Sequence, residues 1–294
     1  MSKSIMKSIV LCSIVFLVLM SAFAGIGCVD QETEEGADAP EPQSIIIKGS
    51  DTVLPLSQAV SEDFMYANPE KSVTVIGGGS GVGIAALIDG EIEIAMASRK
   101  MKDSEFENAE ANGITPVEHI IAWDGVAVVV NPENPVKEIT FEDLKGIYDG
   151  SISNWADVGG EDLPITVITR DSSSGTYGYF QKNVLLGEEY RQDALVQPAT
   201  GAIVQEISQN AGAIGYIGYA YLDDSTTALS LDADGEGYVE ATPENIMAGN
   251  YPLARPLHYY TNGEPSGLAK EFLEYINSET GQDIVSEVGY FPAM

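Results

Sequence analysis

Three segments of the chain combine glycine with serine or threonine in a way that suits anion binding. They read GSDTVLP at 49–55, GGGSGVG at 77–83 and TRDSSSGTYGYF at 169–180, and each stands between a strand-like run and a helical pattern. Glycine lets the backbone approach a ligand, hydroxyl groups donate hydrogen bonds, and a helix start presents unpaired N–H groups at the positive end of its dipole. Together the turns predict a cage of mostly neutral donors around an anion. For any single turn, ordinary helix capping explains the composition equally well.

Two arginines stand at the ends of predicted strands, beside small polar residues. They are Arg99 and Arg170. A planar guanidinium grips a tetrahedral oxyanion with two parallel hydrogen bonds, so arginine at such a position favours an anion site. We expect Arg170 to contact the ligand. For Arg99 two roles stay open, a ligand contact and an ion pair with a nearby carboxylate.

The elements that must position these turns alternate along the chain from Ser44 onward. The predicted strands are 45–47, 73–76, 92–96, 125–130, 165–169 and 213–217. The predicted helices are 52–67, 83–88, 103–112, 141–148, 176–186, 202–209 and 268–276. This alternation predicts an α/β fold with parallel sheets, in which ligands bind beyond the carboxyl ends of the strands. Two apolar stretches flanked by proline, 122–131 and 253–261, predict paired strands that cross between two lobes.

The amino-acid composition and net charge exclude several classes of function. The 294 residues are 44% hydrophobic, which is enough apolar surface for a folded core. The balance of 14 Lys and Arg against 45 Asp and Glu gives a net charge of -31, which disfavours nucleic-acid binding. The two cysteines, Cys12 and Cys28, stand near the amino terminus, so the sequence predicts neither a disulfide framework nor a Cys/His metal site. We expect no metal and no cofactor.

The amino terminus has the pattern of an export signal. Two lysines precede an apolar run at 9–24, which is shorter than the ~20 residues of a comfortable membrane span. We expect a signal peptide at 1–27, lipid attachment at Cys28, and an acidic tether at 28–43. The segment before Cys28 resembles a lipobox, although Gly25 stands where leucine is usual. The alternative is an uncleaved anchor with an incidental cysteine.

From about residue 44 to residue 292 the chain resembles the extracytoplasmic phosphate-binding proteins of ABC-type phosphate importers. The most specific matches are the R-x-x-x-S-G-T turn at 170–176, GSDTVLP, IEIAMASR at 92–99, IYDGSISNW at 147–155 and YPLARPLHYYT at 251–261. The resemblance implies an α/β, two-lobe periplasmic-binding-protein fold of type II, the Venus flytrap, with a hinge of two crossing strands. We expect lobe I at 44–125 plus 252–294, and lobe II at 126–251.

The resemblance also implies individual ligand contacts. Thr52 would donate through its hydroxyl and Val53 through its backbone N–H, while Ser80 lies in the matching loop of the first lobe. The full predicted phosphate-binding set is Ser50, Thr52, Val53, Ser80, Gly81, Ser98, Arg99, Asp124, Arg170, Asp171, Ser174, Gly175 and Thr176.

One departure from the family pattern concerns selectivity. Many members place an aspartate after the Ala-Ser of the strand at 92–98, where it accepts the proton of phosphate and rejects fully ionised sulfate. In this chain Ser98 or Arg99 occupies that place, and neither accepts as a carboxylate does. The candidates to replace it are Asp51, Asp124 and Asp171. Without one of them the chain would accept sulfate or another oxyanion.

The function that follows is capture of inorganic phosphate and its delivery to an ABC-type permease by a monomeric, non-enzymatic protein. It would be exported and act at the outer face of the cytoplasmic membrane, anchored there by lipid, and touch the membrane only through its amino-terminal anchor. The alternatives are a binding protein for sulfate, molybdate or tungstate, a phosphatase-type hydrolase, and an adhesion or signalling protein. The acidic exterior predicts that salt speeds anion association.

Overall fold

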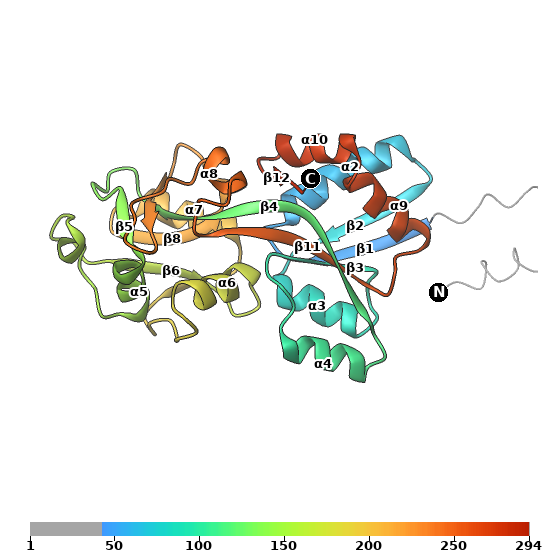
Figure 1. Ribbon diagram of the computed structural model, residues 1–294, viewed down its shortest axis with the longest axis horizontal. Helices are drawn as coiled ribbons and strands as arrows, with labels where there is room; N and C mark the ends of the chain where they lie inside the picture. Colours follow the sequence, from blue (N-terminus) through green and yellow to red (C-terminus); the bar gives the residue numbers. More distant parts are fainter. Residues whose placement is uncertain (1–42, 294) are drawn as a thin grey trace, which may run out of the picture. The chain divides into compact units, whose positions relative to one another are not determined.

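The computed structural model describes residues 43–293, which alternate strands and helices along the chain (Figure 1). In chain order the elements are β1 (Gln43–Gly49), α2 (Leu54–Ala67), β2 (Lys71–Ile76), α3 (Ser80–Ile88), β3 (Ile94–Ala97), α4 (Asp103–Ala111), β4 (Pro116–Val130), β5 (Glu138–Thr140), α5 (Phe141–Asp149), the 3-10 helix η2 (Trp155–Val158), β6 (Thr166–Arg170), α6 (Gly175–Asn183), β7 (Leu195–Gln197), α7 (Thr200–Gln209), β8 (Ala213–Gly218), the 3-10 helix η3 (Tyr219–Tyr221), β9 (Thr227–Ala228), β10 (Ser230–Asp232), α8 (Pro243–Met247), β11 (Ala254–Asn262), α9 (Gly267–Ile276), α10 (Glu279–Glu287) and β12 (Phe291–Pro292). The predicted signal peptide, Cys28 and nearly all of the tether lie outside the described residues. Within 43–293 no helix is long and apolar enough to cross a membrane.

Two α/β lobes share one sheet path, whose strand order is β2-β1-β3-β11-β4-β8-β6-β7. In the first lobe β1 pairs in parallel with β2 and β3, and in the second lobe β6 pairs in parallel with β7 and β8. Strands β4 and β11 run from one lobe to the other, as Figure 1 shows. The predicted crossing strands are therefore present.

The sheets are mixed rather than wholly parallel, in contrast to the sequence prediction. β4 and β11 are antiparallel to each other, β11 is antiparallel to β3, and β4 is antiparallel to β8. The physical reason lies in the connection between the lobes. A strand that leaves the first lobe and a strand that returns to it run in opposite directions, so they meet as an antiparallel pair at the centre of the path.

Separate core clusters fill the two ends of this path. One cluster packs Ile47, Met96 and Phe272 with other residues of β1, β3 and α9. Another packs Val128, Phe180 and Tyr216 with residues of β4, α6 and β8. Each lobe thus has apolar packing of its own, as a pair of bodies joined by a hinge requires. The lobe boundaries given above stay a prediction.

The strand-to-helix turns place their small residues where helices begin. Helix α2 starts directly after the Asp51-Thr52-Val53 turn and has Pro55 in its first turn, where a missing N–H costs nothing. Ser174 caps α6 by accepting a hydrogen bond from the backbone N–H of Tyr177. Gly79 precedes α3 with φ 96°, a conformation that favours glycine.

Candidate functional site

Hydroxyl groups from both lobes meet at the starts of helices α2 and α6. The Oγ1 atoms of Thr52 and Thr176 lie 2.8 Å apart, and both side chains are almost fully buried. The two residues are 124 positions apart in the chain. Two of the three Gly/Ser/Thr turns therefore converge, as the composition of these turns predicts.

Three serines of the first lobe form a chain of contacts beside this pair. The hydroxyl of Ser50 donates to that of Ser98 at 3.0 Å, and the backbone N–H of Ser98 donates to Ser80 Oγ at 3.1 Å. Gly175 of the second lobe faces the same serines. A Cβ atom added there would lie 2.1 Å from Ser80 Oγ and 2.5 Å from Ser98 Oγ. A side chain at this position would require both serine hydroxyls, or the lobes themselves, to move.

A buried ion pair borders the hydroxyl cluster. Arg255 of β11 donates from Nη2 to Asp124 Oδ2 at 2.9 Å and from Nε to the same oxygen at 3.2 Å. Its Nη2 also donates to Thr176 Oγ1 at 3.1 Å. Asp124 is fully buried, and its Oδ1 accepts from the backbone N–H of Tyr219. Burial raises the pKa of Asp124, and the charge of Arg255 opposes that rise.

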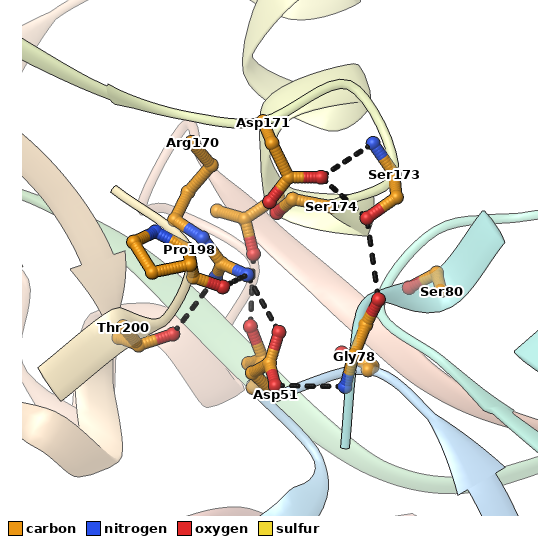
Figure 2. A network of polar contacts seen from close by, with 12 residues as sticks. Asp51, Gly78, Ser80, Arg170, Asp171, Ser173, Ser174, Pro198 and Thr200 are labelled. Carbon is orange, nitrogen blue, oxygen red and sulfur yellow. Dashed lines mark hydrogen bonds and ion pairs between the residues drawn. The ribbon is translucent and has the colours of Figure 1, made fainter. Parts of the chain in front are cut away.

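Arg170 forms a second ion pair, and this one bridges the lobes (Figure 2). Its Nη2 donates to Asp51 Oδ2 at 2.6 Å and to the Pro198 carbonyl at 3.0 Å, and its Nη1 donates to Thr200 Oγ1 at 3.1 Å. The side chain is only 2% exposed. The predicted ligand-binding arginine thus points into the region between the lobes, held on one side by its own lobe and on the other by Asp51.

The remaining predicted residues take part in turns and lobe contacts. Asp171 Oδ1 accepts from the backbone N–H of Ser173, and the hydroxyl of Ser173 donates to the Gly78 carbonyl of the first lobe at 3.2 Å (Figure 2). The N–H of Gly81 donates to the Ser173 carbonyl at 2.9 Å. The N–H of Val53 donates within its own turn, to the Ser50 carbonyl at 3.1 Å.

The side-chain contacts of Arg99 are with residues outside the hydroxyl cluster. Its Nη1 and Nη2 each donate to one oxygen of Glu105 at 2.7 Å, which is a two-pronged ion pair with helix α4. Burial alone would raise the pKa of Glu105, but the hydrogen bonds from Arg99 and from the Lys102 N–H lower it overall. Of the two roles left open for Arg99, the contacts favour the ion pair.

Sequence reasoning did not place Arg255 in the site. The residue stands in the matched segment YPLARPLHYYT, and the signal that would have singled it out is a lone arginine in an apolar strand. Its position depends on strand register, because Arg255 of β11 lies directly opposite Asp124 of β4. Within residues 43–293, no group of three or more His, Cys, Asp or Glu side chains is placed to hold a metal ion.

Comparison with known proteins identifies the family. The model of the PBP superfamily domain matches residues 35–280. The phosphate-binding protein PstS of Bacillus subtilis is 36% identical over 290 residues, which cover 95% of this chain and 93% of the relative. PstS of Pseudomonas aeruginosa is 32% identical over 262 residues, covering 83% of this chain and 81% of the relative.

Solved structures agree with these matches. A Clostridium perfringens structure, described as a phosphate ABC transporter substrate-binding protein with bound phosphate, superposes with a TM-score of 0.78 at 37% identity. The match covers 86% of this chain and 100% of that one. An ABC-type phosphate transport receptor from Vibrio cholerae gives a TM-score of 0.70 at 33% identity, covering 84% and 99% of the two chains. The two-lobe periplasmic-binding-protein fold expected from sequence is confirmed, and the chain belongs to the PBP superfamily and, within it, to the substrate-binding proteins of phosphate ABC transporters.

Proposed function

We propose that this chain captures inorganic phosphate between its two lobes and delivers it to an ABC-type permease. The observation that carries the proposal is the meeting of Thr52 and Thr176, from opposite lobes, at hydrogen-bond distance. The buried Arg255 donates to Thr176, and the buried Arg170 pairs with Asp51, the residue before Thr52. A small tetrahedral anion needs several donors that converge from different directions, and no single lobe supplies them. Closure of the lobes completes the donor set, so binding favours the closed state and release requires reopening at the permease.

The donors have separable roles in this proposal. The hydroxyls of Thr52, Ser80 and Thr176 bind the anion oxygens. Arg170 supplies charge from the second lobe, and it does so without leaving its anchors on the Pro198 carbonyl and Thr200. Because those anchors fix the guanidinium before the ligand arrives, little side-chain entropy is lost on binding.

We assign selectivity for phosphate to Asp124. This carboxylate is fully buried, and its partner Arg255 contacts Thr176 directly, so it lies at the edge of the hydroxyl cluster. A buried carboxylate accepts a hydrogen bond from a protonated phosphate but faces repulsion from sulfate, which carries no proton at neutral pH. Asp51 is another carboxylate near the cluster, paired with Arg170, but its side chain is 11% exposed, so a charge there is less fully desolvated than at Asp124.

Isothermal titration with phosphate, sulfate, molybdate and tungstate tests the proposed ligand. We expect one phosphate per chain and no binding of the other three anions at matched concentration. Stoichiometric binding of one of the others without phosphate would contradict the proposal.

Asp124→Asn and Asp51→Asn then separate the two carboxylates. The change at Asp124 should abolish discrimination against sulfate, because an amide does not repel a proton-free anion as a carboxylate does. The change at Asp51 should leave discrimination intact. Titration of each variant with phosphate and with sulfate measures both effects, and the reverse result would reassign the role to Asp51.

The family is one of substrate-binding proteins, and we extend this to an absence of catalysis in the chain itself. A phosphatase-type hydrolase would release phosphate from an organic phosphate ester with multiple turnovers. We expect incubation with such an ester to give no phosphate beyond the background of a buffer control. Turnover in proportion to protein concentration would favour the hydrolase.

We further propose export with cleavage before Cys28 and lipid attachment at that cysteine, with the folded part acting as a monomer. The support is the sequence pattern of residues 1–28. Cells that express the full chain should carry it in the membrane fraction, and Cys28→Ser should move it to the soluble extracytoplasmic fraction. If the variant stays with the membrane, an uncleaved anchor replaces lipidation in the proposal.

A further inference from the structure

A groove of about 900 Å³ opens beside the hydroxyl cluster, where the two lobes face each other. Its walls are the segment after β3, the helix α6 with the loop that follows it, and β11. Five of the chain's 14 lysines and arginines line it, against two carboxylates, Asp103 and Glu189. The five are Arg99, Lys100, Lys102, Lys182 and Arg255. Because Arg99 and Arg255 each have a carboxylate partner, the local excess of positive charge comes from the three lysines, in a chain of net charge -31.

The lysines of the groove differ from most of the other bases in having no carboxylate partner. Arg99 and Arg255 pair with Glu105 and Asp124, as described above. Among residues 43–293, by contrast, no carboxylate lies within ion-pair distance of Lys100, Lys102 or Lys182. All three are exposed. Their charge is therefore directed at solvent and at whatever enters the groove.

The inner end of the groove reaches the proposed phosphate site. Arg255 lines the groove and also donates to Thr176 Oγ1 and to the Ser98 carbonyl. The ring of Tyr179, another lining residue, lies 5.2 Å from the Arg255 guanidinium. One wall of the groove, helix α6, begins with the residues that form the site. An anion that moves inward along the lysines thus arrives at Arg255 and the hydroxyls.

We propose that this groove is the entrance by which phosphate reaches the site, and that its lysines raise the rate of association. The inference rests on the proposed function. When charges of one sign line a cleft, they focus the electrostatic field there. This raises the association rate of an oppositely charged ligand by about 10- to 1,000-fold in known cases. Here the need is acute, because the net charge of the whole chain repels an anion at long range. The groove supplies a local path along which that repulsion is reversed.

A pair of charge-matched double variants tests this proposal. Lys100→Gln with Lys182→Gln removes one groove lysine from each lobe. Lys137→Gln with Lys270→Gln removes two exposed lysines that do not line the groove, so the change in net charge is the same. Titration calorimetry with inorganic phosphate gives the affinity, and release of radiolabelled phosphate into excess unlabelled phosphate gives the dissociation rate. The association rate follows from the two.

We expect the groove variant to associate about 3- to 10-fold more slowly at low ionic strength, with an unchanged dissociation rate. The matched control should change less than about twofold. At ~1 M salt, where the Debye length is ~3 Å, the difference between the two variants should vanish. Equal association rates in the two double variants, or a change in the dissociation rate alone, would overturn the proposal that the groove is the entrance. Either result would leave the proposed phosphate binding intact. Failure of the unaltered chain to bind phosphate would instead overturn the proposed function.

Discussion

At the scale of single residues, the site depends on charges that are buried and held by several partners. Arg170 and Arg255 are 2% and 1% exposed, and each is paired with an aspartate. A buried pair loses much of its Coulomb gain to desolvation, so such pairs are weak contributors to stability. Their value in the proposed site is positional, because Arg255 is held against Thr176, and Arg170 is held by Asp51, Thr200 and the Pro198 carbonyl.

Arg170→Ala should weaken phosphate binding by about 2–5 kcal/mol, because a dehydrated anion would lose its charged partner. Titration calorimetry measures this directly. Arg170→Lys keeps the charge but not all the anchoring hydrogen bonds, so its affinity should lie between those of Arg170→Ala and the unaltered chain. Thermal unfolding of each variant without ligand checks that the protein is folded. If Arg170→Ala folds and its affinity is unchanged, Arg170 does not belong to the site.

His258 makes the stability of the protein depend on pH. The pKa of His258 is lowered from 6.5 to about 4, mainly by burial; the charge of Glu118 opposes this shift, and the charges of Lys100 and Arg255 contribute to it. The folded state therefore binds fewer protons than the unfolded state between these values, and the free energy of unfolding falls as the pH drops from 6.5 towards 4. In His258→Gln, urea unfolding across this range should show a smaller loss. Equal slopes for the two proteins would exclude His258 as the cause.

At the scale of elements, the spacing of apolar residues and the positions of proline and glycine predicted the long helices and strands well. Helix α2 was expected at 52–67 and spans Leu54–Ala67, since proline stands near both of its ends. Helix α10, Glu279–Glu287, was not predicted, because its sequence ETGQDIVSE has few apolar positions. Five strands of two or three residues were also missed. Such strands are defined by their partners rather than by their own composition.

The crossing strand β4 begins earlier than its sequence suggested. It starts at Pro116 rather than at residue 122, because its first residues gain their partners from β11. The same dependence on pairing explains the missed Arg255, whose place opposite Asp124 is set by the register of these two strands. The Gly/Ser/Thr turns, in contrast, can be recognised from a few consecutive residues, because each stands between a strand and a helix. The convergence of their hydroxyls could therefore be predicted from sequence alone.

Gly175→Ala tests whether the starts of α3 and α6 must touch. The added methyl group would overlap Ser80 Oγ and Ser98 Oγ across the lobes. We expect phosphate affinity to fall at least about tenfold while the folded state persists, because the overlap arises only on closure. Gly201→Ala in α7 is the control, since no atom beyond its chain neighbours and its own helix backbone lies within 4 Å of the added carbon. It should leave affinity unchanged, and equal affinity in both variants would contradict the close approach.

At the scale of the whole molecule, contacts between the lobes define a closed state. The pair Arg170–Asp51 and the hydrogen bond from Gly81 to Ser173 each join residues of different lobes. The strands that carry the chain from one lobe to the other are β4 and β11, which pair from Pro116 opposite Asn262 to Gly125 opposite Ala254. Rotation about those strands would separate the contacts between the lobes without unfolding either core.

Small-angle scattering should follow this motion in solution. We expect the radius of gyration to fall when phosphate is added, because the anion stabilises the closed state relative to more open ones. The same measurement on Gly175→Ala should show a smaller decrease. Stoichiometric binding with no change in radius would indicate that the lobes do not move, and would place ligand exchange in local loop motions instead.

The position of β11 in the sheet has a consequence for how the protein is made. This strand lies between β3 and β4, although about 150 residues of chain separate β3 from β11 in the order of synthesis. A ribosome or translocase delivers β1, β2 and β3 long before β11, so their exposed edge must wait for most of the polypeptide to appear. A second lobe at 126–251, as predicted from sequence, would be continuous in the chain and could assemble first. The edge of β3 is thus among the last to gain its partner strand. A chaperone that covers this unpaired edge would protect the nascent protein from aggregation.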